Sequence, residues 1–243
     1  VSLTLPRVLM RLPYGPDTIP VEGVNFKEET TGEDHSKYLW GNPAFILGER
    51  VANAFSLYGW TAAIRGVEGG GKVEGLPVHT FKTADGDETF KCPTEVAITD
   101  RREKELNDLG FISLLHCKNT DYAAFFGGQT TNKPKLYNTN EANANAHLSA
   151  MLPYVLNASR FAHYVKVIVR DKIGSFATED NLRDYLNTWI SDFVLGKDDA
   201  GQSIKAQYPL REARVDVTPI PGRPGSYNAV SYTHLTLPTI AIV

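Results

Sequence analysis

Hydrophobic and polar positions along the chain follow two periods, and each period predicts a different kind of element. Residues alternate with a period of two from Arg214 to Thr218, and the sequence Pro-Gly-Arg-Pro-Gly at 221–225 turns the chain before Tyr227 to Tyr232. This pattern predicts a β-hairpin near the end of the chain. Apolar residues at three- and four-residue steps instead predict helices over Asn140 to Ile173 and Thr178 to Leu195.

Helix boundaries can be predicted from residues that cap, begin or stop a helix. Asn and Thr favour the N-cap, Pro fits the first turn, and Gly ends a helix in a left-handed conformation. The predicted boundaries are Asn42 and Gly66 for a first helix, Pro153 (a kink or a second start) and Gly174 for the region 140–173, and Thr178 and Gly196 for the last helix.

The stretch from Pro93 to Tyr137 predicts a compact strand–helix–strand unit. Asp100 and Glu103 have capping-box spacing, and such a short unit favours a right-handed parallel crossover. Its predicted parts are a strand at 95–98, a helix with Leu106 and Leu109 facing inward, a stop at Gly110, a buried strand at Phe111 to Leu115, and a polar loop at Gly127 to Tyr137 with a contact role.

The remaining segments predict shorter elements. They are an extended arm at Val1 to Leu12, a surface loop at Tyr14 to Lys37, a hairpin over Val78 to Cys92 and a short helix at Ala200 to Tyr208. The fold class expected from all of these is α/β: a mixed sheet with a βαβ unit, long packed helices and a C-terminal β-hairpin. We expect residues 1–230 to form the core of the protein. Residues Ser231 to Val243 contain no Asp, Glu, Lys or Arg, and we predict that they are a non-native tail.

Composition narrows the function classes. The 243 residues are 42% apolar and 22% charged, with a net charge of −3, so no basic excess exists for general nucleic-acid binding. No apolar run approaches the roughly 20 residues that span a bilayer. Cys92 and Cys117 lack CxxC spacing and predict two reduced thiols in a cytosolic protein.

The segment Gly66 to Lys72, GVEGGGK, matches the phosphate-binding loop G-x-x-x-x-G-K through its lysine. Val73 stands where that loop needs Ser or Thr, and Glu74 to Pro77 cannot readily open the helix whose N-terminus would bind phosphate. We therefore expect a flexible glycine hinge here, and we keep a nucleotide-binding enzyme as the alternative.

No set of residues predicts catalysis or metal binding. His116 and Asp121 are near one another in sequence but have no nucleophile in a recognisable order. His147 and His163 lack the spacing of metal ligands, and we interpret them as ordinary polar or interface residues. The prediction is a protein that is not an enzyme, with no catalytic, cofactor-binding or metal site.

Seven segments in order carry a resemblance to one family. They are LPRVLMRLPYG (5–15), YLWGNPAF (38–45), YGWTAAIRGVEGGGKVEGLPVHTF (58–81), PTEVAITDRREKELNDLGF (93–111), KNTDYAAFFGGQ (118–129), RFAHYVKVIVRDKIGSF (160–176) and YPLREARVDV (208–217). Together they resemble the large subunit of the type VI secretion contractile sheath, the EvpB/VipB/TssC family, and this chain resembles its C-terminal half.

The resemblance implies a structural role in the bacterial cytoplasm without a cofactor. Members of this family pair with a small sheath subunit and stack in helical rings around a tube of Hcp hexamers. Contraction drives that tube outward, and a hexameric AAA+ ATPase recycles the contracted sheath. Neighbouring subunits share sheets, and we expect the strands within Ala213 to Val230 to contribute to this sharing. The resemblance implies no membrane or nucleic-acid partner.

Overall fold

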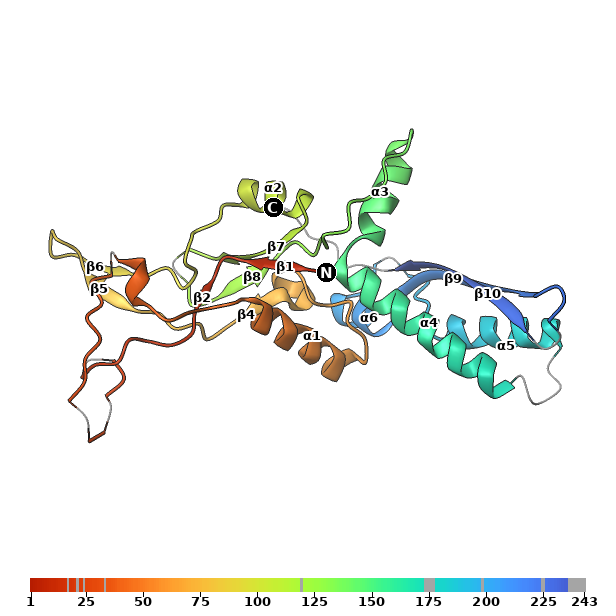
Figure 1. Cartoon of the computed structure of the whole chain (residues 1–243), viewed down its shortest axis with the longest axis horizontal. Coiled ribbons are helices and arrows are strands. Elements are labelled where there is room, and N and C mark those ends of the chain that lie inside the picture. The colour runs from red at the N-terminus through yellow and green to blue at the C-terminus, as the bar shows by residue number, and fades with distance from the viewer. Residues whose placement is uncertain are drawn as a thin grey trace. The chain divides into compact units, whose positions relative to one another are not determined.

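The computed structural model describes residues 1–235 except 17, 21, 24, 33, 119, 173–177, 198, 224 and 225. The chain forms two compact units (Figure 1). Unit 1 comprises Val1–Arg50 and Arg65–Lys133, and unit 2 comprises Val51–Ile64 and Pro134–Val243. The predicted division into a core at 1–230 and a non-native tail stays a prediction, and residues 236–243 lie outside the described part.

Unit 1 is built on a four-stranded mixed sheet, which confirms the α/β class. The strand order is β1 (Leu3–Leu5), β7 (Phe111–His116), β8 (Ala123–Phe125) and β4 (Lys72–Val73). β1 runs parallel to β7, whereas β8 is antiparallel to both β7 and β4. The central strands have near-continuous burial, as expected for strands covered on both faces.

The predicted compact βαβ unit is wrong, because residues 95–98 form no strand. Glu95 donates its backbone N–H to the carbonyl of Arg7 outside any strand, and the parallel partner of β7 is β1, more than a hundred residues upstream in the chain. Helix α2 (Asp100–Asp108) does form between them and ends at Gly110, whose φ of 93° confirms the predicted stop.

The predicted capping box of α2 is also wrong, and its predicted inner face is wrong at Leu109, whereas Leu106 is half-buried. Thr99 occupies the N-cap position, which places Asp100 inside the helix, and no side chain caps this end. Leu109 is 73% exposed. The inward positions include Glu103 and Asn107, whose role is described below.

Three smaller elements of unit 1 match their predictions. β5 (Thr80–Lys82) and β6 (Glu88–Phe90) form the expected antiparallel hairpin, with Gly86 at a φ of 89° in its turn. The N-terminal arm forms β1 and β2 (Val8–Leu9), and β2 pairs with β3 (Trp40–Gly41). The surface loop contains one 3-10 turn, η1 (His35–Lys37).

Helix α1 (Ala44–Tyr58) begins as predicted but ends earlier. The Oδ1 of Asn42 accepts the N–H of Ala44 at 2.9 Å, so Asn42 caps the helix. The helix stops at Gly59, not Gly66, since Gly59 adopts a φ of 73° and donates its N–H to the carbonyl of Phe55. Gly66 lies seven residues further on, in the glycine loop.

Unit 2 contains the second part of α1, from Val51 onward, together with helices α3 to α6 and the C-terminal hairpin. α3 (Asn140–Ser149) is followed by α4 (Leu152–Lys172), so Pro153 stands in the first turn of a second helix, as predicted. The predicted stop at Gly174 lies outside the described residues. α6 (Gln202–Gln207), β9 (Leu210–Pro219) and β10 (Tyr227–Leu235) confirm the predicted short helix and hairpin.

Helix α5 (Glu179–Ser191) begins at the predicted cap, because the hydroxyl of Thr178 accepts the N–H of Asn181 at 3.4 Å. Its predicted end at Gly196 is wrong. Residues 193–195 instead run alongside the start of β9: Leu210 donates its N–H to Phe193 at 3.2 Å and accepts the N–H of Leu195 at 2.8 Å. Pairing with a strand therefore ended the helix before the glycine.

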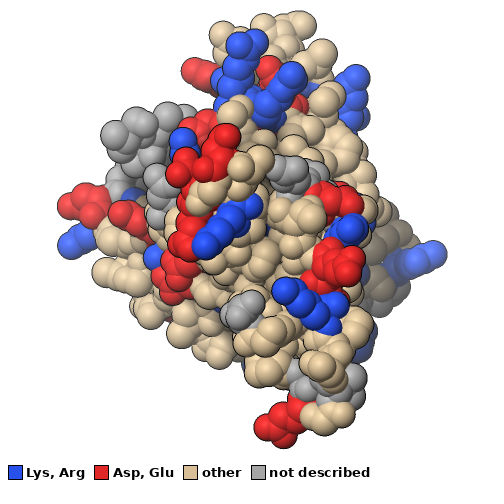
Figure 2. Space-filling model, turned by 90° about the vertical axis from the view of Figure 1, so that its left-hand side faces the viewer, with Lys and Arg blue, Asp and Glu red and all other residues tan. Residues whose placement is uncertain are grey.

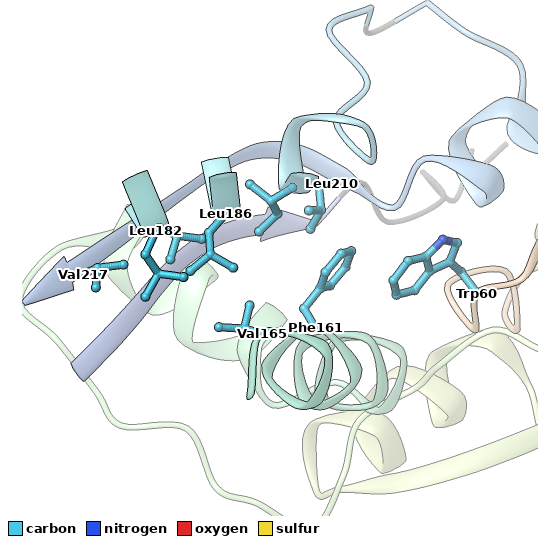
Figure 3. Packing of buried hydrophobic residues seen from close by; sticks show 9 residues of the cluster. Trp60, Phe161, Val165, Leu182, Leu186, Leu210 and Val217 are labelled. Atoms are coloured by element: carbon cyan, nitrogen blue, oxygen red, sulfur yellow. The ribbon is translucent and has the colours of Figure 1, made fainter. Parts of the chain in front are cut away.

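The core of unit 2 joins α4, α5, β9 and the chain that follows α1. Figure 3 shows Trp60 and Phe161 facing one another, with Leu182 and Leu186 of α5 and Leu210 of β9 nearby. The rings of Trp60 and Phe161 stack with centroids 4.3 Å apart. The full cluster is Trp60, Phe161, Val165, Leu182, Leu186, Ile190, Leu210, Val215 and Val217.

In unit 1, Arg11 and Glu28 form a bidentate ion pair at 2.7 and 2.8 Å that fixes the start of the surface loop. The same carboxylate accepts the backbone N–H of Tyr14 at 2.9 Å. The hydrogen bonds from Arg11 are the main cause that lowers the pKa of Glu28 from 4.5 to about 2.

Replacing Arg11 with Met should raise the pKa of the Glu28 carboxyl from about 2 toward its ordinary 4.5. Because the folded-state pKa is lowered, the pair stabilises the loop fully above pH 4.5 and loses that contribution as the pH falls toward 2. Carbon-13 NMR titration of the Glu28 carboxyl measures the change. Glu29, the neighbouring carboxyl, serves as the internal control, and an unchanged Glu28 midpoint in the variant would contradict the assignment.

Candidate functional site: the free edge of the C-terminal hairpin

The glycine loop at Gly66–Lys72 does not have the architecture of a phosphate-binding loop. Val67–Gly71 form a single π-turn, and strand β4 follows directly, so the loop does not lead into a helix whose N-terminus could bind phosphate. The ammonium of Lys72 is paired with Glu74 and lies 4.6 Å from the centre of the Tyr122 ring. The nucleotide-binding alternative therefore finds no support in the geometry.

Close packing explains one glycine of this loop, Gly71, whereas Gly66 and Gly70 have positive φ angles. A Cβ on Gly71 would lie 2.5 Å from the carbonyl oxygen of Phe125 and 2.7 Å from the Cα of Arg65. Gly66 also donates its N–H to Phe125 at 2.7 Å. The loop is thus a closed turn packed against β8, and its predicted flexibility stays a prediction.

His116, which belongs to no predicted site, has a partner in the local structure. The Nε2 atom of His116 lies 2.7 Å from the carbonyl oxygen of Thr120, in the turn between β7 and β8.

Among the residues that the structure describes, no three His, Cys, Asp or Glu side chains are placed to hold a metal ion. Figure 2 shows charged residues of both signs on this face of the molecule.

The loop after β8 is held by polar residues of α2. Asn107 accepts the backbone N–H groups of Gly128 and Gln129 through Oδ1, both at 3.2 Å. A Cβ on Gly127 would lie 2.4 Å from that oxygen and 2.5 Å from Oε1 of Glu103. Burial raises the pKa of Glu103, and the nearby Arg65 opposes that rise.

This arrangement explains why α2 turns polar residues inward: they satisfy loop N–H groups that would otherwise be buried without partners. The loop further along is exposed, and Asn143 exchanges two hydrogen bonds with the backbone of Tyr137 at 2.7 and 3.1 Å. The contact role predicted for Gly127 to Tyr137 stays a prediction.

The β9–β10 hairpin has the clearest features of an assembly surface. β10 and β9 form a two-stranded sheet, and the start of β9 also pairs with Val194 through a parallel bridge at Leu210. β9 contributes buried Val215 and Val217, whereas most of β10 is exposed, including Val230 at 48% and Tyr232 at 59%. A β-strand with an unpaired edge is a template for another strand.

The register shows which backbone groups of the hairpin point outward. Ile220 donates its N–H to Ser226 at 2.9 Å, and antiparallel pairs alternate between hydrogen-bonded and non-hydrogen-bonded. The pairs Asn228–Thr218 and Val230–Asp216 are therefore hydrogen-bonded, and the N–H and C=O groups of Ala229 point to the free edge.

Two side chains form hydrogen bonds that agree with this alternation. Each occupies outward backbone groups at one edge of the hairpin. Asn187 of α5 accepts the N–H of Val215 at 2.9 Å and donates to its carbonyl at 2.8 Å, so it occupies the outward groups of this one residue of β9. Tyr154 of α4 donates its hydroxyl to the outward carbonyl of Thr233 at 3.2 Å. The free edge is consequently the middle of β10, around Ala229.

A groove of about 770 Å³ lies beside this edge, between α4 and the inward face of β10. Its floor is mainly apolar, and Lys166 and Arg170 add two cations. The lining residues are Ala158, Phe161, Ala162, Val165, Lys166, Val169 and Arg170 from α4, and Tyr227, Asn228, Ala229, Ser231 and Thr233 from β10. A strand added to β10 would extend the sheet over part of α4.

Sequence reasoning identified the hairpin but missed Asn187 and Tyr154. Asn187 stands directly after Leu186 in the apolar face of α5, and a lone amide in such a face is a signal for a buried backbone partner. Tyr154 carries no comparable signal, because a tyrosine in a helix is usually explained by packing alone.

Comparison with known protein families gives one match in each of the two units. Residues 1–132 match the family description "EvpB/VC_A0108, tail sheath N-terminal domain", and residues 141–239 match "EvpB/VC_A0108, tail sheath gpW/gp25-like domain". The first match alone covers more than half of the chain. The chain therefore belongs to the EvpB/VC_A0108 family of tail sheath proteins.

One curated relative is named as a sheath protein of a type VI secretion system. The chain is 53% identical over 230 residues to "Type VI secretion system sheath protein TssC1" of Pseudomonas aeruginosa PAO1. The aligned part is 94% of this chain but 46% of the relative, so the chain spans about half the length of the protein it matches. In the described residues, no helix has both the length and the apolar character needed to cross a membrane.

Proposed function

We propose that this chain is part of the large subunit of a type VI secretion contractile sheath and that it acts by assembly, not catalysis. The observation that carries the proposal is the match of both units to tail sheath domains, together with 53% identity to a protein named as a sheath protein. The full-length protein pairs with a small sheath subunit, forms a helical tubule around Hcp hexamers and is recycled by an AAA+ ATPase, all in the bacterial cytoplasm.

The free edge of β10 is the proposed contact for a strand from a neighbouring subunit. The outward backbone groups around Ala229 are exposed, and the adjacent groove would receive the side chains of an added strand. The edge of β9 is less suitable, because Asn187 already bonds both outward groups of Val215. Of the predicted segment Ala213 to Val230, the proposal therefore keeps only the second strand as the contact with a neighbouring subunit.

A sheath that contracts needs contacts that persist while subunits move. Main-chain hydrogen bonds across a shared sheet supply such a link, since they depend on backbone and survive rigid-body rotation of the cores. The core behind β9 is well packed, which suits a subunit that moves as a rigid body.

Coexpression of the full-length protein with its small partner tests the proposal. We expect hollow tubules by negative-stain electron microscopy. Soluble monomers across a range of salt and pH would contradict a sheath role. Calorimetry with ATP and magnesium tests the enzyme alternative, and heat that disappears in Lys72→Ala would revive it.

A further inference from the structure

The groove between α4 and β10 carries positive charge and no negative charge. Among the described residues that line it, Lys166 and Arg170 are cationic and none is Asp or Glu. Both cations are exposed, and in the part of the chain that the structure describes no ion pair involves either of them. Their charge is therefore available to a molecule that enters the groove.

The two cations belong to one stripe of α4. Side chains at four-residue steps lie above one another along a helix, and the stripe consists of Ala158, Ala162, Lys166 and Arg170. The neighbouring positions Phe161 and Val165 are buried in the core of unit 2. The exposed border of the groove thus has two small apolar side chains at one end and two cations at the other.

α4 and β10 run in opposite directions along the groove (Figure 1). Tyr154, near the start of α4, donates its hydroxyl to the carbonyl of Thr233, near the end of β10. The cationic end of the stripe therefore lies toward Tyr227, at the start of β10, beside the free edge at Ala229. A strand that pairs with β10 passes the cations and the alanines in turn.

We propose that the strand which a neighbouring subunit adds to β10 carries an Asp or Glu that faces Lys166 and Arg170. The same strand carries an apolar residue, four positions away, that faces the two alanines. This inference rests on the proposed function, which supplies the added strand. It adds the chemistry by which the groove recognises that strand.

The spacing of four follows from the geometry of helix and strand. The midpoints of the two pairs, positions 160 and 168, are eight residues apart on α4, which is about 12 Å at about 1.5 Å per residue. A strand advances about 3.4 Å per residue, and only residues an even number apart point to the same face. Four is the even number that comes nearest to this distance.

Charge gives the groove a selectivity that backbone pairing lacks. Main-chain hydrogen bonds across a shared sheet supply affinity for any extended segment, whereas side-chain pockets supply specificity. A carboxylate held between the sheet and α4 would be partly removed from water, where its attraction to the two cations is stronger. A basic side chain at the same place would be repelled, so the groove disfavours basic strands.

Coexpression of the full-length protein with its small partner, followed by tubule counts in negative-stain micrographs, tests this inference. Lys166→Glu together with Arg170→Glu reverses both charges at exposed positions. We expect tubule numbers to fall by about tenfold or more, because like charges across a contact oppose association. Lys166→Gln together with Arg170→Gln, which only removes the charges, should give a smaller loss. Circular dichroism of the isolated chains shows whether each variant folds, and the glutamine variant decides if the reversed one does not.

Lys104→Glu together with Lys197→Glu is the matched control, because it changes the net charge equally at two exposed lysines outside the groove. It should form tubules at the wild-type level.

A charge swap identifies the acidic partner. In the reversed variant, Asp→Lys or Glu→Lys substitutions made one at a time in either sheath subunit should restore tubules at the position that faces the groove. Wild-type tubule numbers from the reversed variant, an equal loss in the control, or restoration at no position would overturn the inference and leave the sheath role intact. Absence of tubules from the wild-type pair would instead contradict the sheath role itself.

Discussion

Phe161→Ala should destabilise unit 2 by about 3–5 kcal/mol, the usual cost of removing a buried phenylalanine from a packed core. Phe161 is 1% exposed, and its ring contacts aromatic residues from three parts of the unit. It stacks on Trp60 and meets Trp189 and Phe193 edge-on, with centroids 6.1 and 5.6 Å away. Loss of the ring therefore leaves a cavity and also removes geometry-specific aromatic contacts.

The measurement is urea unfolding followed by near-ultraviolet circular dichroism, which reports the aromatic cluster. Val167→Ala in the same helix is the control, since Val167 is 38% exposed and its loss should cost less than about 1 kcal/mol. Typical domains are stable by only about 5–15 kcal/mol, so the Phe161 variant should unfold at a clearly lower urea concentration. Equal midpoints for the two variants would contradict the assignment of Phe161 to the core.

Features set by short-range chemistry could be predicted from the sequence. Asn42 and Thr178 do cap their helices, Gly110 does end α2, and the two strands of the C-terminal hairpin do pair. Each depends on a side chain or a φ angle within a few residues of the element it ends. Such local rules do not require knowledge of what packs against the element.

Long-range pairing could not be predicted. The parallel partner of β7 is β1, and nothing in the local pattern of Leu3–Leu5 or Phe111–His116 specifies the other. The end of α5 was missed for a related reason: pairing of Phe193 and Leu195 with Leu210 competes with helix formation. Tertiary contacts decided both cases.

Hydrophobic spacing predicted the inward face of α2 only in part. Leu109 is exposed, while Asn107 faces the backbone of Gly128 and Gln129. Hydrophobic periodicity assumes that a helix packs on apolar side chains. Here α2 also packs on a glycine-rich backbone, which needs hydrogen-bond acceptors.

The candidate site, too, could be predicted from the sequence only in part. The hairpin was predicted from its alternation, but which of its edges is free depends on Asn187 and Tyr154, which belong to other elements. Only the combination of register and these two contacts singles out Ala229.

Ala229→Pro in the full-length protein should abolish tubules while leaving the subunit folded. The N–H of Ala229 points away from β9, so proline removes a donor from the free edge without removing a hydrogen bond of the hairpin. An added strand would lose that hydrogen bond and meet the proline ring. Val230→Pro, one residue on, should instead break the bond to Asp216 and destabilise the hairpin itself.

The measurement pairs electron microscopy of coexpressed subunits with circular dichroism of the isolated chain. Ala229→Val is the matched control, because it enlarges the same side chain but keeps the N–H, and it should form tubules. Tubules from Ala229→Pro at wild-type yield would exclude β10 as the shared edge, without contradicting the sheath role. Loss of tubules in both variants would point to the Ala229 side chain, not to its backbone, as the feature that assembly requires.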